Sequence, residues 1–125
     1  MTEARPDGPG EELFADGKRS GAGEFLGSQK HGRWTYWHRN GGLKAQGEYV
    51  AGVLHGPWEW FRENGQPLQR GAFDHGEQVG PGQRWHATGQ LLDSGSYESG
   101  VKTGEWTTYA PDGSVKSTKN HRGPR

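Results

Sequence analysis

The sequence predicts an all-β protein built from about five consecutive β-hairpins that pair antiparallel throughout. Three observations predict this fold class. Glycines recur every 24 residues in four interleaved series, aromatic residues recur in the same register, and an Asn-Gly or Asp-Gly pair stands in most repeats. A fixed period in the range of roughly 20–50 residues is typical of stacked repeats, so we expect a β-solenoid-like array.

The glycine series set the boundaries of the repeats. The first series starts each repeat and consists of Gly8, Gly32, Gly56, Gly80 and Gly104. The other series are Gly17, Gly41, Gly65, Gly89 and Gly113; Gly23, Gly47, Gly71 and Gly95; and Gly52, Gly76 and Gly100. We therefore expect a flexible N-terminus at 1–7, a repeat domain at 8–113, and a last strand with a basic tail at 114–125.

The turns are predicted from the residues beside the second glycine series, which are Asp16, Asn40, Asn64, Thr88 and Asp112. Asn-Gly and Asp-Gly pairs favour a type I′ turn, which needs positive φ at both central residues. The flanking segments, such as 33–39 and 47–50, are rich in aromatic and β-branched residues and predict strands of about 5–7 residues.

The remaining segments of each repeat are predicted to join one hairpin to the next. The sequences AGVLHG, HGEQVG and SGVKTG have glycine near both ends and predict loops. Pro9, Pro57 and Pro81 each follow a glycine of the first series. Because proline is tolerated at the first residue of a strand, these prolines predict where strands begin.

Aromatic residues in constant columns are expected to hold neighbouring hairpins together. The three columns are Phe25, Tyr49, Phe73 and Tyr97; Trp37, Phe61, Trp85 and Tyr109; and Trp34, Trp58 and Trp106, which Gly82 interrupts. A buried ring removes roughly 150–250 Å² from water, and glycines opposite the rings would make room for them. Trp58 and Phe61 lie three residues apart, so either both faces of the sheet are covered or a bulge changes the phase.

Composition excludes several classes of function. The 125 residues carry 15 basic and 15 acidic side chains, so we expect no nucleic-acid binding and no general binding to anionic membranes. The chain has no cysteine and starts without an apolar targeting segment, which favours a cytoplasmic location. The six histidines lack zinc-site spacing, and no phosphate-loop or catalytic motif is present, so we expect no metal, no cofactor and no enzymatic activity.

The stretch YVAGVLHGPWEWFRENG, Tyr49–Gly65, resembles the MORN repeat in its bacterial variant form. The resemblance covers roughly Gly8 to Gly113 and departs from the pattern at Gly82 and at Lys119, which replaces a glycine of the third series. It implies an open, twisted, single antiparallel sheet of successive hairpins that acts as an interaction or scaffold module. It also implies a bacterial toxin as one partner, because small variant-repeat proteins are often antitoxins or immunity partners.

One column differs between the copies and is the best candidate for a binding face. It reads Tyr36, Trp60, Arg84 and Thr108. Tyrosine, tryptophan and arginine are the usual hot-spot residues of protein interfaces. The predicted partner-binding residues are Tyr36, His38, Trp60, Arg62, Arg84 and His86.

Other interpretations of these residues stay open. The variable side chains could simply face solvent, and exposed Trp and Tyr rings could stack on sugars of a glycan or cell wall. Phospholipid contact is less favoured, because the chain has no net charge. The exposed edges of an open sheet also predict pairing of two copies into a homodimer.

Overall fold

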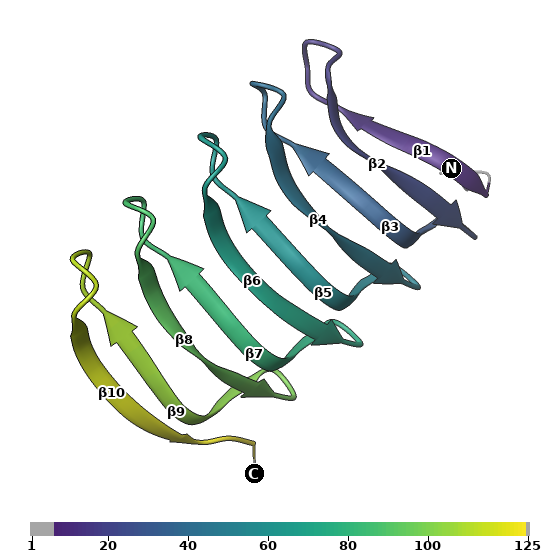
Figure 1. The fold of residues 1–125 in the computed structure, drawn as a ribbon. Helices are drawn as coiled ribbons and strands as arrows, with labels where there is room; N and C mark the ends of the chain where they lie inside the picture. Colours follow the sequence, from purple (N-terminus) through teal and green to yellow (C-terminus); the bar gives the residue numbers. More distant parts are fainter. Residues whose placement is uncertain (1–6, 125) are drawn as a thin grey trace.

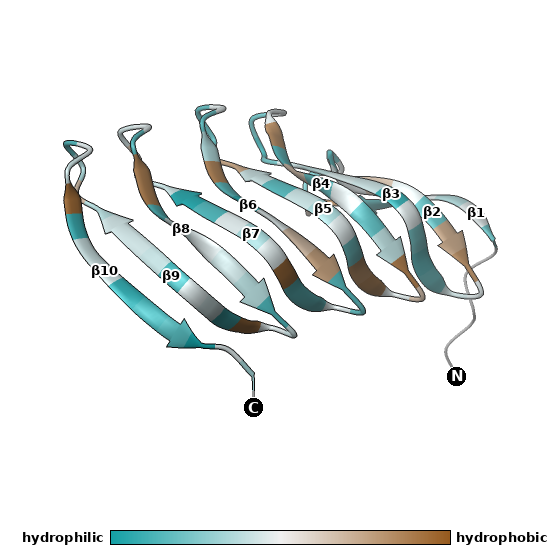
Figure 2. Ribbon diagram, turned by 60° about the horizontal axis from the view of Figure 1, so that its bottom comes forward, coloured by the Kyte–Doolittle hydropathy of each residue, from teal (hydrophilic) through white to brown (hydrophobic). Residues whose placement is uncertain are grey.

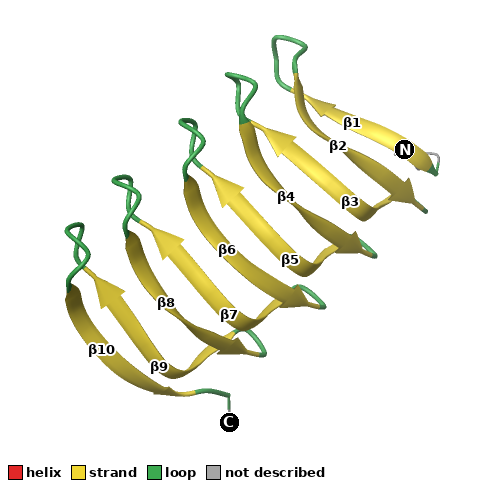
Figure 3. Ribbon diagram, viewed as in Figure 1, coloured by secondary structure: helices red, strands yellow, loops and turns green. Residues whose placement is uncertain are grey.

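The computed structural model describes residues 7–124, and that range contains only strands, turns and loops (Figure 1; Figure 3). Its ten strands are β1 (Gly8–Leu13), β2 (Arg19–Leu26), β3 (Gln29–Trp37), β4 (Leu43–Val50), β5 (Val53–Phe61), β6 (Pro67–Asp74), β7 (Glu77–Trp85), β8 (Leu91–Glu98), β9 (Val101–Tyr109) and β10 (Val115–Arg122). They lie in one sheet in sequence order, and each pairs antiparallel with the next. The sheet is open and twisted (Figure 1), which confirms the predicted fold class.

The two ends of the sheet carry opposite charges. Edge strand β1 holds Glu11 and Glu12, whereas edge strand β10 holds Lys116, Lys119 and Arg122. Charged side chains along an edge strand oppose its pairing with an identical edge. The pairing of two copies through these edges stays a prediction.

The N-terminal segment that was predicted to be flexible is described only at its last residue. Residues 1–6 lie outside the described part of the chain. The carboxylate of Asp7 accepts a hydrogen bond from the backbone N–H of Gly27 at 2.6 Å. Asp7 is therefore attached to the turn between β2 and β3.

Two kinds of turn alternate along the chain, and the type I′ prediction was made for the wrong kind. Positive φ at two adjacent residues occurs at Gly27–Ser28, Ala51–Gly52, His75–Gly76 and Ser99–Gly100. At the Asn40–Gly41 pair only the glycine has positive φ, at 88°. There the N–H of His38 donates to the carbonyl of Gly42 at 2.8 Å, which closes a three-residue loop. Such a loop is a type I turn followed by one left-handed residue.

Asparagine has a different role in this loop from the one predicted. The side-chain oxygen of Asn40 accepts a hydrogen bond from the N–H of Gly42 at 2.8 Å, and Asn64 and Asp112 make the same contact in their repeats. This Asx turn favours Asn or Asp without requiring positive φ. The pairs do mark hairpins, but through a longer loop.

The segments predicted as loops between hairpins are mostly strand, so that prediction was wrong. In AGVLHG, the turn takes only Ala51 and Gly52, and β5 begins at Val53. Because these turns need only two residues, β2 to β10 reach eight or nine residues, longer than predicted.

Proline marks irregularities inside strands, and the prediction that it marks their beginnings was wrong. Pro57 and Pro81 lie in the middle of β5 and β7. Gly56, directly before Pro57, has a φ of 71°, and the register of β4 against β5 shifts between Gln46 and Glu48. A bulge tolerates a residue that cannot donate to the neighbouring strand, which explains the proline.

The core of this single-layer sheet consists of indoles that lie on glycines. Trp34, Trp58 and Trp106 are 0%, 2% and 5% exposed. A Cβ atom would overlap one of these indoles at three positions, Gly23, Gly47 and Gly95. Each indole N–H also donates to a carbonyl of the preceding strand at 2.9 Å. Glycine therefore makes the room that lets a large ring lie flat against the backbone.

Both faces of the sheet are partly covered by rings, which settles the question raised by Trp58 and Phe61. Trp58 and Trp60 share a face, with stacked rings 5.7 Å apart between centroids. Phe61 follows Trp60 directly and so points to the other face, and the register against β6 shifts at the same place. On that other face Arg70 covers the ring of Trp85 at 5.5 Å.

This core does not stand out by residue hydropathy. Figure 2 shows the most hydrophobic segments near the ends of strands, beside the turns. Several of those side chains, including Val50, Val53 and Val101, are more than 40% exposed. Tryptophan, tyrosine and glycine lie near the middle of the hydropathy scale, which explains how a chain with a mean hydropathy of −1.10 forms an ordered core.

Candidate functional site

The aromatic face of the sheet is defined by nine rings that lie on one side. They are Phe25, Trp34, Tyr36, Tyr49, Trp58, Trp60, Phe73, Tyr97 and Trp106. Neighbouring rings are 5.0–6.4 Å apart between centroids, and the contacts run from Phe25 to Phe73 and resume at Tyr97. The buried indoles give this face a rigid base.

A row of side chains that differ between repeats crosses the aromatic face. We call it the variable row, and its members in order across the sheet are Tyr36, Ala45, Trp60, Gln69, Arg84 and Asp93. Each member pairs with the next on the adjacent strand. Tyr36 and Trp60 are half-buried and Arg84 is exposed. The structure thus brings three of the predicted partner-binding residues into one continuous surface.

A lysine and a glutamate that the sequence did not single out complete one end of this row. The Nζ of Lys30 donates to the hydroxyl of Tyr36 at 2.7 Å and lies 3.1 Å from the carboxylate of Glu12. It also lies 4.8 Å from the ring centroid of Trp34. The hydroxyl groups of Tyr36 and Tyr49 are 2.9 Å apart. This cluster fixes the position of the Tyr36 ring.

The same cluster changes the acidity of its tyrosines. Burial raises the pKa of Tyr49, and the hydrogen bond with Tyr36 raises it further. Burial also raises the pKa of Tyr36. The folded protein therefore favours the protonated form of both hydroxyls.

Stability is expected to decrease above about pH 10, and to decrease less in Tyr49→Phe. Because its pKa is raised, folded Tyr49 keeps its proton at a pH where the unfolded tyrosine, with a pKa near 10, loses it. Its contribution is complete below that pH and is lost as the pH rises through the folded pKa. Urea denaturation between about pH 7 and about pH 11 measures this, and equal slopes for wild type and variant would contradict it.

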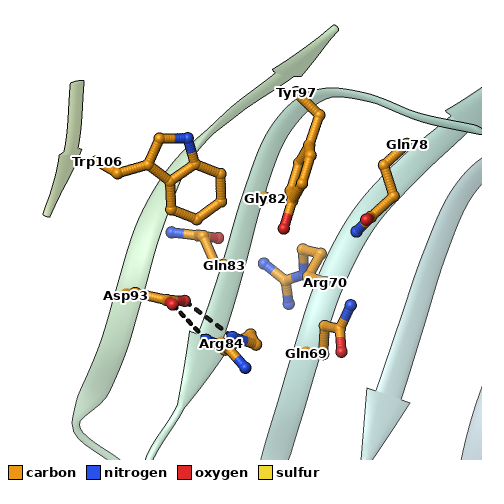
Figure 4. Close-up of a pocket in the computed structure, with 9 residues that line it drawn as sticks. All are labelled: Gln69, Arg70, Gln78, Gly82, Gln83, Arg84, Asp93, Tyr97 and Trp106. Carbon is orange, nitrogen blue, oxygen red and sulfur yellow. Dashed lines mark hydrogen bonds and ion pairs between the residues drawn. The ribbon is translucent and has the colours of Figure 1, made fainter. Parts of the chain in front are cut away.

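At the other end of the variable row, Arg84 and Asp93 form a two-point ion pair (Figure 4). The Nε of Arg84 donates to one carboxylate oxygen at 3.1 Å, and a terminal nitrogen donates to the other at 2.5 Å. The bond to Asp93 raises the pKa of Arg84. Asp93 is only 5% exposed, whereas half of the Arg84 side chain faces solvent. The pair holds the guanidinium in place on a partly exposed side chain.

The other three predicted partner-binding residues bond to the backbone of the next repeat. The Nε2 of His38 donates to the carbonyl of Phe61, and that of His86 to the carbonyl of Tyr109, both at 2.8 Å. Arg62 donates from a terminal nitrogen to the carbonyl of Trp85 at 2.9 Å. These side chains link the three-residue loops of successive repeats. The structure does not bring them into the variable row, and their role in binding stays a prediction.

Sequence reasoning missed Lys30, Glu12 and Asp93. A signal for Asp93 was present, because its column reads Ala45, Gln69 and Asp93 and so varies together with the column of Arg84. The cross-strand pairing of Arg84 with Asp93 would have linked the two columns. The column of Lys30 also varies, since it reads Lys30, Leu54, Gln78 and Lys102, but its contacts with the rings of Trp34, Tyr36 and Tyr49 are seen only in the structure.

Two other kinds of site are absent from residues 7–124. In that range, no three His, Asp or Glu side chains lie close enough to hold a metal ion. No helix with the length and hydropathy of a membrane span occurs there either.

Comparison with known proteins places the repeats in a family. The family model described as MORN repeat variant matches residues 30–51, 54–75 and 102–122, which together cover just over half of the chain. The matched segments leave out 76–101, the part that contains Gly82. No curated protein matches the chain. Repeats of this family generally mediate binding to proteins or to membrane lipids. The chain belongs to the MORN repeat variant family.

Proposed function

We propose that this chain is a non-enzymatic cytoplasmic protein that binds another protein through the variable row of its aromatic face. The observation that carries the proposal is the contrast between two adjacent rows. Tryptophan and glycine recur in the row that forms the core, whereas the neighbouring row changes from Tyr36 to Trp60 to Arg84. Packing explains the constant row, and recognition of a partner explains the variable one.

The chemistry of the row suits a protein interface. Tryptophan, tyrosine and arginine are enriched among the residues that dominate interface energies. Trp60 stacks on the buried Trp58, and Arg84 is held by Asp93, so both are ordered before a partner arrives. Binding then costs less conformational entropy than it would with free side chains.

Two other partner classes fit the face less well. A sugar would need an open ring surface, but Trp34, Trp58 and Trp106 are buried. An anionic lipid would need free cations, but Lys30 is paired with Glu12 and Arg84 with Asp93. A protein partner can use half-buried rings and paired charges together.

The finer proposal is that the partner is a bacterial toxin whose active surface the chain covers. Its support is the resemblance of these repeats to those of small antitoxin and immunity proteins. Occlusion needs no catalytic group, and a rigid sheet with ten strands offers a broad surface for it. Restored growth of cells that co-express the captured partner with this chain would support a toxin, and unchanged growth would contradict it.

The binding face is tested by variants that change the row without breaking the core. Trp60→Ala is expected to weaken the complex by about 2 kcal/mol or more, which is roughly thirtyfold. The double variant Arg84→Tyr with Asp93→Ala gives the third copy of the row the Tyr36–Ala45 pair of the first copy. It avoids leaving Asp93 buried without its partner and is also expected to weaken binding. Affinity for the captured partner is measured by isothermal titration calorimetry.

A matched control lies on the opposite face of the same strands. Gln46 pairs with Glu59 there, away from the variable row. Gln46→Ala is expected to bind as wild type does. If folded Trp60→Ala and the double variant bind the partner as tightly as wild type, the aromatic face is not the binding surface.

A further inference from the structure

One position in the tryptophan row of the aromatic face is open. In the other repeats an indole covers the glycine of the preceding strand, so that a Cβ there would overlap the ring. The pairs are Trp34 on Gly23, Trp58 on Gly47, and Trp106 on Gly95. Gly82 occupies the tryptophan position of the next repeat, so no indole of this chain covers Gly71. A Cβ on Gly71 would meet no atom within 4 Å. The backbone of Gly71 is therefore a bare surface of the kind that indoles cover elsewhere.

The residues that surround this open space can be identified by comparison with the preceding repeat. The indole of Trp58 contacts the rings at positions 36, 49 and 60, at centroid distances of 6.4, 5.1 and 5.7 Å. Twenty-four residues later the same positions hold Trp60, Phe73 and Arg84. Two rings and a guanidinium thus lie where they would contact an indole over Gly71, and a guanidinium is a favourable neighbour for a ring face.

The space is bounded on its other side by Tyr97. The ring of Tyr97 leans toward Gly82, with an atom 3.2 Å from where a Cβ would lie. Figure 4 shows Tyr97 beside Gly82, with Gln78 and the Arg84–Asp93 pair around them.

We propose that this space, which we call the Gly71 site, binds a tryptophan side chain of the partner protein. The inference rests on the proposed function, and it names the partner's anchoring group. Its floor is a glycine backbone, as in the other repeats, and its walls are two rings and a guanidinium. All six tryptophans of this chain lie among the described residues at positions of their own, so the indole comes from another molecule.

The site also offers a hydrogen-bond acceptor for the incoming ring. Each indole of the row donates its N–H to the carbonyl ten residues earlier, at Glu24, Glu48 or Ser96. The corresponding carbonyl for position 82 is that of Ala72. A partner tryptophan that lies over Gly71 with its N–H toward Ala72 would reproduce the contacts of the row. Tryptophan is also the residue most often found as an interface hot spot.

The site is tested without the partner, with N-acetyl-tryptophanamide as the probe. A single side chain of this size is expected to bind with a dissociation constant on the order of 1 mM. Amide NMR shifts of the full chain are followed during titration. Saturable shifts centred on Gly71, Gly82 and Arg84 are expected. No saturable shift at these residues up to about 10 mM probe overturns the proposal.

Three variants make the result specific. Gly82→Trp fills the site from within and is expected to raise the urea midpoint of unfolding while it weakens probe binding at least about tenfold. Gly71→Leu places a side chain in the same space, on the glycine that lies beneath it. This variant tests the site if Gly82→Trp does not fold. The matched control is Gln46→Trp, which adds the same side chain on the opposite face of β4, away from Gly71 and Gly82, and is expected to bind the probe as wild type does.

The outcomes separate this site from the proposed function. If the probe binds but the captured partner binds Gly82→Trp as tightly as wild type, the site is not part of the interface, and the assignment to a partner tryptophan is wrong. If N-acetylglucosamine produces the saturable shifts and the tryptophan probe does not, the assigned ligand class is wrong. Loss of both probe and partner binding in Gly82→Trp and Gly71→Leu, with an intact control, supports the site.

Discussion

Replacing Trp58 with alanine is expected to lower the free energy of unfolding by about 3–5 kcal/mol, the usual cost of removing a fully buried large ring. Trp58 is 2% exposed and contacts three other rings on the aromatic face. Its N–H donates to the carbonyl of Glu48 at 2.9 Å, and that carbonyl loses its partner in the variant. The sheet has no second layer to close over the gap, so the loss is not repaired by repacking.

The position of Trp58 in the array makes its effect larger than a local contact would. In a repeat protein each unit is stabilised by its nearest neighbours, and Trp58 joins the second and third repeats. We therefore expect the variant to unfold in two steps, with the repeats on either side separating. Urea denaturation followed by circular dichroism and by amide hydrogen exchange measures both effects.

The control for this prediction is Trp37→Ala. Trp37 is half-buried on the opposite face, where Arg19 covers its ring at 4.7 Å. We expect it to cost less than half as much. A loss of under about 1 kcal/mol for Trp58→Ala, or equal losses for the two variants, would show that the buried indoles do not carry the stability of the sheet.

The fold could be predicted because the 24-residue period has no insertion, so most glycines and rings of one repeat have a counterpart in the next. The turn types could not. Asn-Gly suits both a type I′ turn and a three-residue loop that ends in a left-handed glycine, and the loop length, which depends on the pairing of the two strands, decides between them. The bulge at Gly56 likewise depends on the pairing of two strands, which the sequence of one strand does not show.

The part of the candidate site that could be predicted consists of residues at equivalent positions of successive repeats. Tyr36, Trp60 and Arg84 lie together because equivalent residues of stacked repeats must lie in a row. The bonds that His38 and His86 make to the next repeat could not be predicted, since they depend on where a loop carbonyl points. The open space over Gly71 had a sequence signal at Gly82, but only the structure shows that no neighbouring side chain covers it.

Two chemically identical substitutions, Gly47→Ala and Gly71→Ala, are expected to differ by about 3 kcal/mol or more in the free energy of unfolding. Both glycines occupy the same column, on β4 and β6, and neither has positive φ, so alanine adopts the backbone of each. At Gly47 the added methyl would overlap the indole of Trp58, and the ring must leave its place. At Gly71 the methyl meets no atom within 4 Å.

The sign of the change in the free energy of unfolding for Gly71→Ala shows whether glycine is needed here for side-chain packing or for its backbone conformation. Replacing glycine by alanine in a compatible conformation stabilises a protein by about 0.4–1 kcal/mol, because the unfolded chain loses freedom. Gly71→Ala is therefore expected to be neutral or stabilising, and Gly47→Ala strongly destabilising, in the same urea titration. Gly95→Ala, under Trp106, should behave like Gly47→Ala. Equal effects at Gly47 and Gly71 would mean that glycine is required in this column for the backbone alone, and that the space over Gly71 is not the counterpart of an indole position. A large difference would establish that the column exists to admit rings, and that at Gly71 the ring is missing.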